Sequence, residues 1–158
     1  MKRLLLLTLI LMFMLAGCTV PQSNGHYTAE FPYEPLQYMV FLKKEIQGIE
    51  NQVTTAMSHA VLVERGDYSA EQAAASAENS LLNIKAARMS IDVMRPPVKY
   101  IDTRAFALDI ISTIEKDMDE FITELTKANP SGERMLEIKK SLHGNSISLA
   151  GLVNAYWV

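Results

Sequence analysis

The chain has 158 residues, a formal net charge of −3 at pH 7 and a single cysteine. This length suffices for one domain with a hydrophobic core, and one cysteine excludes an internal disulfide. Phosphate binding needs clustered Lys and Arg, so the acidic balance argues against nucleic acid as a partner. It argues equally against electrostatic docking onto anionic lipid.

The first 17 residues predict an export signal. Lys2 and Arg3 precede an apolar run from Leu4 to Leu15, which only Thr8 interrupts. Positive residues hold such an end on the cytoplasmic side of a membrane. The run has the length of a signal-peptide core and falls short of the roughly 20 residues that span a bilayer. A retained transmembrane anchor is the alternative.

Leu15-Ala16-Gly17-Cys18 closes this segment and resembles the lipobox of bacterial lipoproteins. The resemblance implies cleavage between Gly17 and Cys18 and attachment of two or three acyl chains, palmitate among them, at Cys18. More than one chain is what stable anchoring requires. The resemblance thus implies a cell-membrane protein, lipid-anchored on the extracytoplasmic side. Without the preceding residues, Cys18 would be interpreted as a free buried thiol.

Residues 18–34 are expected to form the lipidated cysteine and a flexible tether. Residues 19–34 show no periodicity and are rich in Pro, Gly, Ser and Asn, a composition typical of irregular segments. A flexible coil of this length reaches about 20 Å. The folded domain is therefore expected over residues 35–158.

Four long amphipathic helices are predicted after the tether, over residues 35–65, 70–94, 98–127 and 132–157, because apolar residues recur there at steps of three and four. Gly66 predicts a left-handed helix end, Ser69 and Gln72 a capping box, and Pro96-Pro97 a break. The expected buried stripes are Met39, Leu42, Ile46, Ile49, Val53, Met57, Ala60 and Val63; Ala73, Ala77, Leu81, Ile84, Ala87, Ile91 and Met94; Ile101, Ala105, Leu108, Ile111, Ile114, Met118, Phe121 and Leu125; and Met135, Ile138, Leu142, Asn145, Leu149, Leu152 and Tyr156. The third helix is expected to carry Asp109, Glu115, Lys116, Asp119, Glu120 and Glu124 on a solvated face.

Short links between long amphipathic helices favour antiparallel neighbours. The predicted fold is therefore all-α, an up-down antiparallel four-helix bundle. An open pair of helical hairpins that closes only on a partner or in a dimer is the alternative. Pro96-Pro97, Tyr100 and the long helix that follows also give the domain a general similarity to small all-helical bacterial lipoproteins of unknown function. That similarity implies no functional residues.

Most catalytic and metal-binding patterns are missing from the sequence. The histidines are His26, His59 and His143, and the sequence holds no Glu-x-x-His, no His-Glu-x-x-His and no cysteine pair. It also holds no Gly-x-Ser-x-Gly and no phosphate-binding glycine loop. His59 and His143 are the two that could meet, but two histidines do not fill the coordination sphere of a metal. We expect no catalytic residue, no metal and no cofactor.

Asn145 is the candidate buried polar residue, in the middle of the last apolar stripe. It could fix helix register by bonding across the core, or form a ligand-facing polar spot with Ser141 and Ser148. It could also mark a kink beside Gly144.

The leading hypothesis for function is a non-enzymatic, membrane-anchored envelope protein that binds another envelope protein or a second copy of itself. The helix ends and the tail Tyr156-Trp157-Val158 are candidate contacts, because aromatic residues are favoured at interfaces. A helical carrier of a small ligand or metal is the alternative, with a cavity lined by Met and Ala. A hydrolase acting on wall or lipid would need a carboxylate or nucleophile cluster that the sequence does not reveal.

Overall fold

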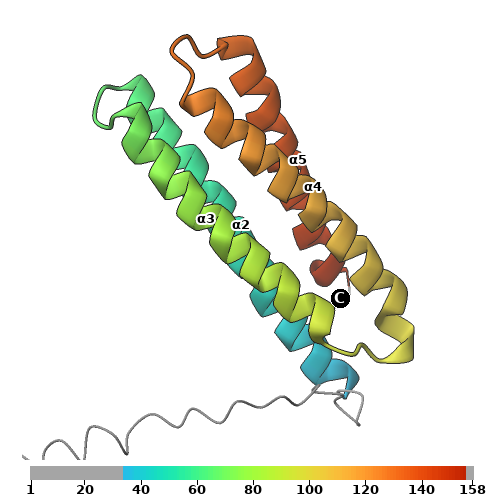
Figure 1. The fold of residues 1–158 in the computed structure, drawn as a ribbon. Coiled ribbons are helices and arrows are strands. Elements are labelled where there is room, and N and C mark those ends of the chain that lie inside the picture. Colours follow the sequence, from blue (N-terminus) through green and yellow to red (C-terminus); the bar gives the residue numbers. More distant parts are fainter. Residues whose placement is uncertain (1–33, 156–158) are drawn as a thin grey trace, which may run out of the picture. The chain divides into compact units, whose positions relative to one another are not determined.

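The computed structural model of the chain describes residues 34–155, which belong to one compact unit. Over these residues the helices are α2 (Pro35–Glu64), α3 (Ala70–Val93), α4 (Ile101–Leu125) and α5 (Gly132–Asn154), with a 3-10 turn, η1 (Val98–Tyr100), before α4. Consecutive helices are antiparallel neighbours, and α5 also packs against α2 (Figure 1). The predicted all-α four-helix bundle is confirmed, and its two hairpins close on each other without a partner.

Local sequence sets the helix ends where the patterns predicted them. Gly66 has a φ of 80°, a conformation that glycine adopts without steric cost. At the start of α3, the Ser69 hydroxyl accepts a hydrogen bond from the Gln72 backbone at 3.2 Å, and the Gln72 side chain accepts one from the Ser69 backbone at 2.9 Å. The predicted capping box is therefore present.

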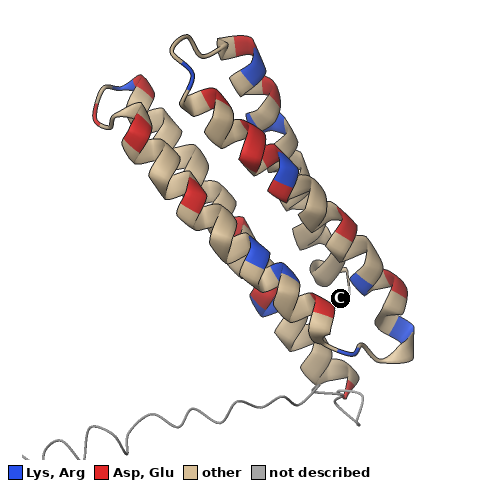
Figure 2. Ribbon diagram, viewed as in Figure 1, with Lys and Arg blue, Asp and Glu red and all other residues tan. Residues whose placement is uncertain are grey.

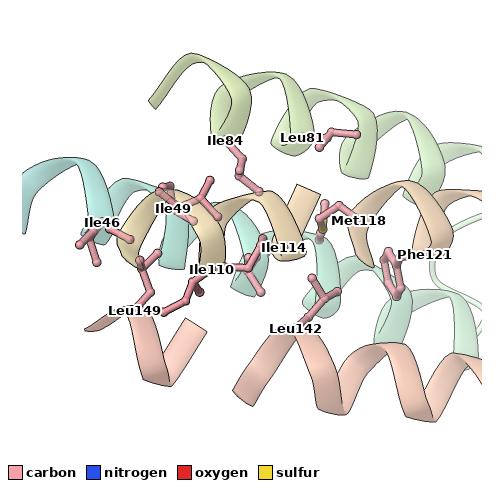
Figure 3. Packing of buried hydrophobic residues seen from close by; sticks show 14 of the residues in the cluster. Ile46, Ile49, Leu81, Ile84, Ile110, Ile114, Met118, Phe121, Leu142 and Leu149 are labelled. Carbon is pink, nitrogen blue, oxygen red and sulfur yellow. The ribbon is translucent and has the colours of Figure 1, made fainter. Parts of the chain in front are cut away.

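The core is a single cluster of apolar side chains from all four helices. Figure 3 shows side chains of α2, α3, α4 and α5 turned toward one another. The largest fully buried ones are Tyr38, Phe121, Leu42, Ile46, Ile49, Ile84, Ile91, Ile111, Ile114, Met118, Leu142 and Leu149. Full burial of one such side chain stabilises the fold by about 1.5–3 kcal/mol. Within residues 34–155, no helix has a stretch long and apolar enough to cross a membrane.

The first turns of α4 differ from the expected stripe. Ile101 and Ala105 are exposed, whereas Thr103, Ala107 and Ile110 are buried. The predicted stripe advanced by three residues several times in succession, and each three-residue step falls about 60° short of a full helical turn. The expected stripe therefore rotated away from the core toward the beginning of the helix.

Leu81 and Leu82 provide a matched test of this core. Leu81 is 5% exposed and Leu82 is 64% exposed, although they are adjacent in α3. Leu81→Ala should lower the free energy of unfolding by about 2–5 kcal/mol because it leaves a cavity. Leu82→Ala should change it by no more than about 0.5 kcal/mol. Urea denaturation followed by circular dichroism measures both; equal losses would contradict the helix orientation.

Candidate functional site

Several residues singled out in the sequence lie outside the described residues. These are Gly17, Cys18, His26 and the tail Tyr156-Trp157-Val158. Lipidation and cleavage therefore stay predictions. Asn145, His59 and His143 can be placed.

Asn145 joins α5 to α4 at the edge of the core. Its side-chain amide donates to Asp117 Oδ2 at 3.2 Å and to Ser141 Oγ at 3.3 Å, and the Ser141 hydroxyl donates to the same Asp117 oxygen at 2.7 Å. Asn145 is only half-buried, and Ser146 is the buried polar residue of this turn. The sequence therefore predicted the buried polar position at Asn145, one residue before the one that the structure buries. Because α5 is continuous here, the geometry favours the register hypothesis over the kink.

Ser148 takes no part in this polar spot. Its hydroxyl donates to the Gly144 carbonyl at 2.9 Å, within α5. The expected ligand-facing group of Ser141, Asn145 and Ser148 is therefore replaced by a link between two helices through Asp117. The Asn145 amide nitrogen, the Ser141 hydroxyl and Asp117 Oδ2 each have a protein partner in that link, as is usual for a structural contact.

The two placed histidines differ in their surroundings. His59 Nδ1 lies 2.5 Å from Ser76 Oγ, and its ring lies 5.1 Å from that of Tyr68. His143 is exposed on α5. Residues 34–155 include no group of three His, Cys, Asp or Glu side chains that could hold a metal ion. Among the contacts described, His59 has no carboxylate partner to orient it, as the histidine of a catalytic triad has.

Glu124 was expected on a solvated face and is instead buried. Its Oε1 accepts a hydrogen bond from the Ser131 backbone at 2.5 Å, and its Oε2 pairs with the Lys127 ammonium. Ser131 in turn caps α5 by accepting from the Arg134 backbone at 3.3 Å. Glu124 therefore ties the end of α4 to the start of α5. Sequence periodicity missed it because its partners lie in the loop between the two helices.

The bonds to Glu124 make stability dependent on pH. The Lys127 hydrogen bond first, and then the Ser131 N–H, lower the pKa of the Glu124 carboxyl. A lowered pKa contributes stability that is present above the unfolded-state pKa, about 4.3, and is lost as pH falls through the folded value. Glu124→Gln should lower the melting temperature at pH 7, and the difference from wild type should narrow below about pH 5. Glu133→Gln, at an exposed glutamate, is the control, and thermal unfolding is measured for both variants from pH 7 to below pH 5. If the melting temperatures of Glu133→Gln and wild type also converged at low pH, the role assigned to Glu124 would be contradicted.

Tyr38 holds the opposite end of the bundle. It is fully buried, its ring stacks on Tyr100 at 5.7 Å, and its hydroxyl has no hydrogen-bond partner among the described residues. Arg104 lies at this end too: its Nε donates to the Ile91 carbonyl at 3.1 Å, and its Nη2 to Asp92 Oδ1 at 2.9 Å. The stack and the arginine join α2, α3 and α4.

Burial raises the pKa of Tyr38 to about 12, and the charge of Arg104 opposes part of that rise. A raised pKa contributes stability that is present below the unfolded-state pKa, about 10, and is lost as pH rises through the folded value. Tyr38→Phe should remove this loss above about pH 10 and leave stability at pH 7 unchanged or higher, because the hydroxyl is buried without a partner. Thermal unfolding at both pH values measures it; marked destabilisation at pH 7 would show that the hydroxyl is bonded.

Two pockets lie at the end where α4 meets α5. The larger, of about 370 Å³, is lined by charged side chains such as Glu120, Lys127 and Arg134, and Arg134 is paired with Glu120 and Glu137. The smaller, of about 200 Å³, is apolar and lies under the loop before α5. Small-molecule sites commonly measure about 300–1,000 Å³. The apolar pocket is smaller than this range, and the charged side chains of the larger pocket are already paired with one another, so neither pocket favours a carrier of a small ligand.

The outer face of α3 carries a row of exposed apolar side chains. Leu82, Met89 and Val93 are 64%, 67% and 76% exposed, and the exposed Ala86 lies between them. Steps of four, three and four residues place all four on one side of the helix. We call this row the α3 stripe. The sequence pattern did not predict this row, because the one apolar stripe expected on this helix was that of its buried face.

Comparisons with family models, with curated proteins and with solved structures find no match to this chain.

Proposed function

We propose that the chain is a membrane-anchored envelope lipoprotein that works as a non-enzymatic protein-interaction module. The α3 stripe (Leu82, Ala86, Met89 and Val93) is the observation that carries the proposal. It is the surface through which the bundle would bind a helix of another envelope protein or of a second copy.

The geometry of the stripe suits packing against a helix. Leu82 and Val93 are 11 residues apart, so the stripe extends for about 16 Å, or three helical turns. Two cations and an acid, Lys85, Arg88 and Asp92, lie on the same helix beside it. An apolar centre with a polar rim is the usual anatomy of a protein–protein interface. Burying the stripe against a partner would remove from water the apolar area that the bundle leaves exposed.

The paired state of the charged groups supports binding over catalysis. Within the described residues, Glu124, Glu120 and Asp117 each bond to neighbouring protein groups. A general base or nucleophile needs free access to a substrate. The polar contacts of the bundle instead join helices to one another, which supports a rigid scaffold that presents a surface.

Membrane anchoring rests on the sequence Leu15-Ala16-Gly17-Cys18 and its resemblance to a lipobox. A lipid on Cys18 would hold the bundle at the extracytoplasmic face of the cell membrane. It would also raise the local concentration of the α3 stripe relative to other membrane-bound partners. A modest contact surface would then suffice for association.

Photo-crosslinking from Met89 tests the proposal in the full-length chain expressed in cells. A photoreactive residue at Met89 should give an adduct of one defined mass, and one at the exposed Thr113 of α4 should give none. Adding Leu82→Lys should reduce the Met89 adduct at least tenfold, because it places a charge in the contact. The matched change Leu136→Lys, at an exposed leucine of α5, should leave it unchanged.

Intact mass of the purified protein tests the anchor separately. The expected chain begins at Cys18 and carries the added mass of two or three acyl chains. A chain that retains residues 1–17 without acyl groups would contradict anchoring, and equal adducts at positions 89 and 113 would contradict the interaction surface.

A further inference from the structure

A second exposed apolar surface lies at the end of the bundle where α2 begins, which we call the tether end. It comprises the first turn of α2 and residues 94–101, which link α3 to α4. The 5.7 Å stack of Tyr38 on Tyr100 holds these two segments side by side, at the end where the cyan and yellow segments meet in Figure 1. This surface is distinct from the outer face of α3.

The tether end exposes large apolar side chains at the tip of the molecule. Val98 is 86% exposed, Leu36 is 66% exposed and Ile101 is 51% exposed. Val98 is the first residue of the 3-10 turn and Ile101 directly follows it, whereas the third residue of the turn, Tyr100, is buried in the core. The burial of Tyr100 thus fixes the turn that presents Val98 to the outside.

Cations accompany these apolar side chains. Arg95 and Lys99 are both exposed on the link, and the Lys99 ammonium lies 4.7 Å from the centre of the Tyr100 ring. Apolar groups combined with Lys and Arg are typical of surfaces that rest in the headgroup region of a bilayer. Each cation near an anionic membrane surface adds attraction.

Charge is unevenly divided along the bundle (Figure 2). When each helix is divided at its midpoint, the half at the tether end (34–49, 83–112 and 144–155) has seven Lys or Arg and five Asp or Glu, a net charge of +2. The other half (50–82 and 113–143) has six Lys or Arg and twelve Asp or Glu, a net charge of −6. Net charge argued against docking onto anionic lipid, but its distribution favours docking by one end.

The proposed lipid on Cys18 favours the membrane as the occupant of this surface. Cys18 precedes Pro35 by 17 residues, and a coil of that length reaches about 20 Å. The 30 residues of α2 extend for about 45 Å. A lipid on Cys18 would therefore keep the tether end within reach of the headgroups, whereas the far end of an upright bundle would stand beyond them.

We propose that the tether end rests on the bilayer, with Val98, Ile101 and Leu36 in the interfacial layer and Arg95 and Lys99 at anionic lipid phosphates. The inference rests on the proposed lipid anchor at Cys18. The acidic far end then points away from the negatively charged surface, and the α3 stripe runs up the side of an upright bundle. The membrane contact thereby orients the stripe toward partners anchored in the same membrane.

A fluorescent label at position 98 tests this orientation. The lipidated full-length chain carrying Val98→Cys is labelled with an environment-sensitive dye and reconstituted into vesicles of phosphatidylcholine and phosphatidylglycerol, some with spin-labelled lipid as quencher. Cys18 is the sole natural cysteine, and its sulfur would be blocked by lipid. The label at 98 should emit at shorter wavelength and be quenched by the lipid, while a label at Ala128→Cys, in the loop at the far end, should show neither effect.

Variants at the tether end separate charge from apolar contact. Arg95→Gln with Lys99→Gln should lower the ratio of docked to undocked protein by about fivefold for each cation removed. Pure phosphatidylcholine should have a similar effect on the unaltered chain. Ile101→Ser should reduce quenching at 98, whereas Leu136→Ser, at an exposed leucine of the far half, should not.

Three outcomes overturn the proposal. A label at 98 that stays in water while the protein floats with the vesicles would refute docking but preserve the anchor. Disulfide pairing between unlabelled Val98→Cys chains, together with no lipid quenching of the dye in the labelled chains, would assign the tether end to a second copy. Protein that does not float with vesicles and shows no acyl mass would refute the anchor itself.

Discussion

Mutual burial of four apolar stripes is the constraint on which the rest of this structure depends. In proteins, most of the stability of a helix comes from tertiary packing of its apolar face, so each of these helices of 23 to 30 residues depends on the neighbouring helices that cover its stripe. The packing of α5 against α2 closes the bundle. The loop contacts and the polar links between helices therefore lie outside the apolar core. Glu124 fixes the turn between α4 and α5 at one end, and the stack of Tyr38 on Tyr100 at the other end joins α2 to the link before α4.

The polar side chains that could form a catalytic cleft hold the bundle together, and the features available for binding are exposed apolar surfaces. Glu124, Asp117 and the partly buried His59 are engaged in contacts between helices or with loops. By contrast, the α3 stripe and the tether end expose apolar side chains that contribute nothing to the core. A protein held near a membrane could use both, one surface for the lipid and one for a protein neighbour, because they lie on different sides of the same rigid bundle.

Periodicity predicted the four helices and most of the core, and the short links between the helices predicted antiparallel neighbours. It placed Gly66, Ser69 and Gln72 correctly because capping depends on local sequence. It was wrong at Ile101 and Ala105, where small errors in phase accumulate over several turns. It missed the burial of Glu124, which depends on a loop partner. The α3 stripe went unnoticed because one apolar row was taken to account for the whole helix.

We propose that another protein covers the outer face of α3 in cells. The most direct measurement is the rate at which a membrane-permeant maleimide modifies a cysteine placed at Met89, in living cells and in the purified protein. Relative to a cysteine at Thr113, modification at position 89 should be at least tenfold slower in cells and equally fast after purification. Equal rates at both positions in cells would show that the α3 stripe is bare there and would contradict the account.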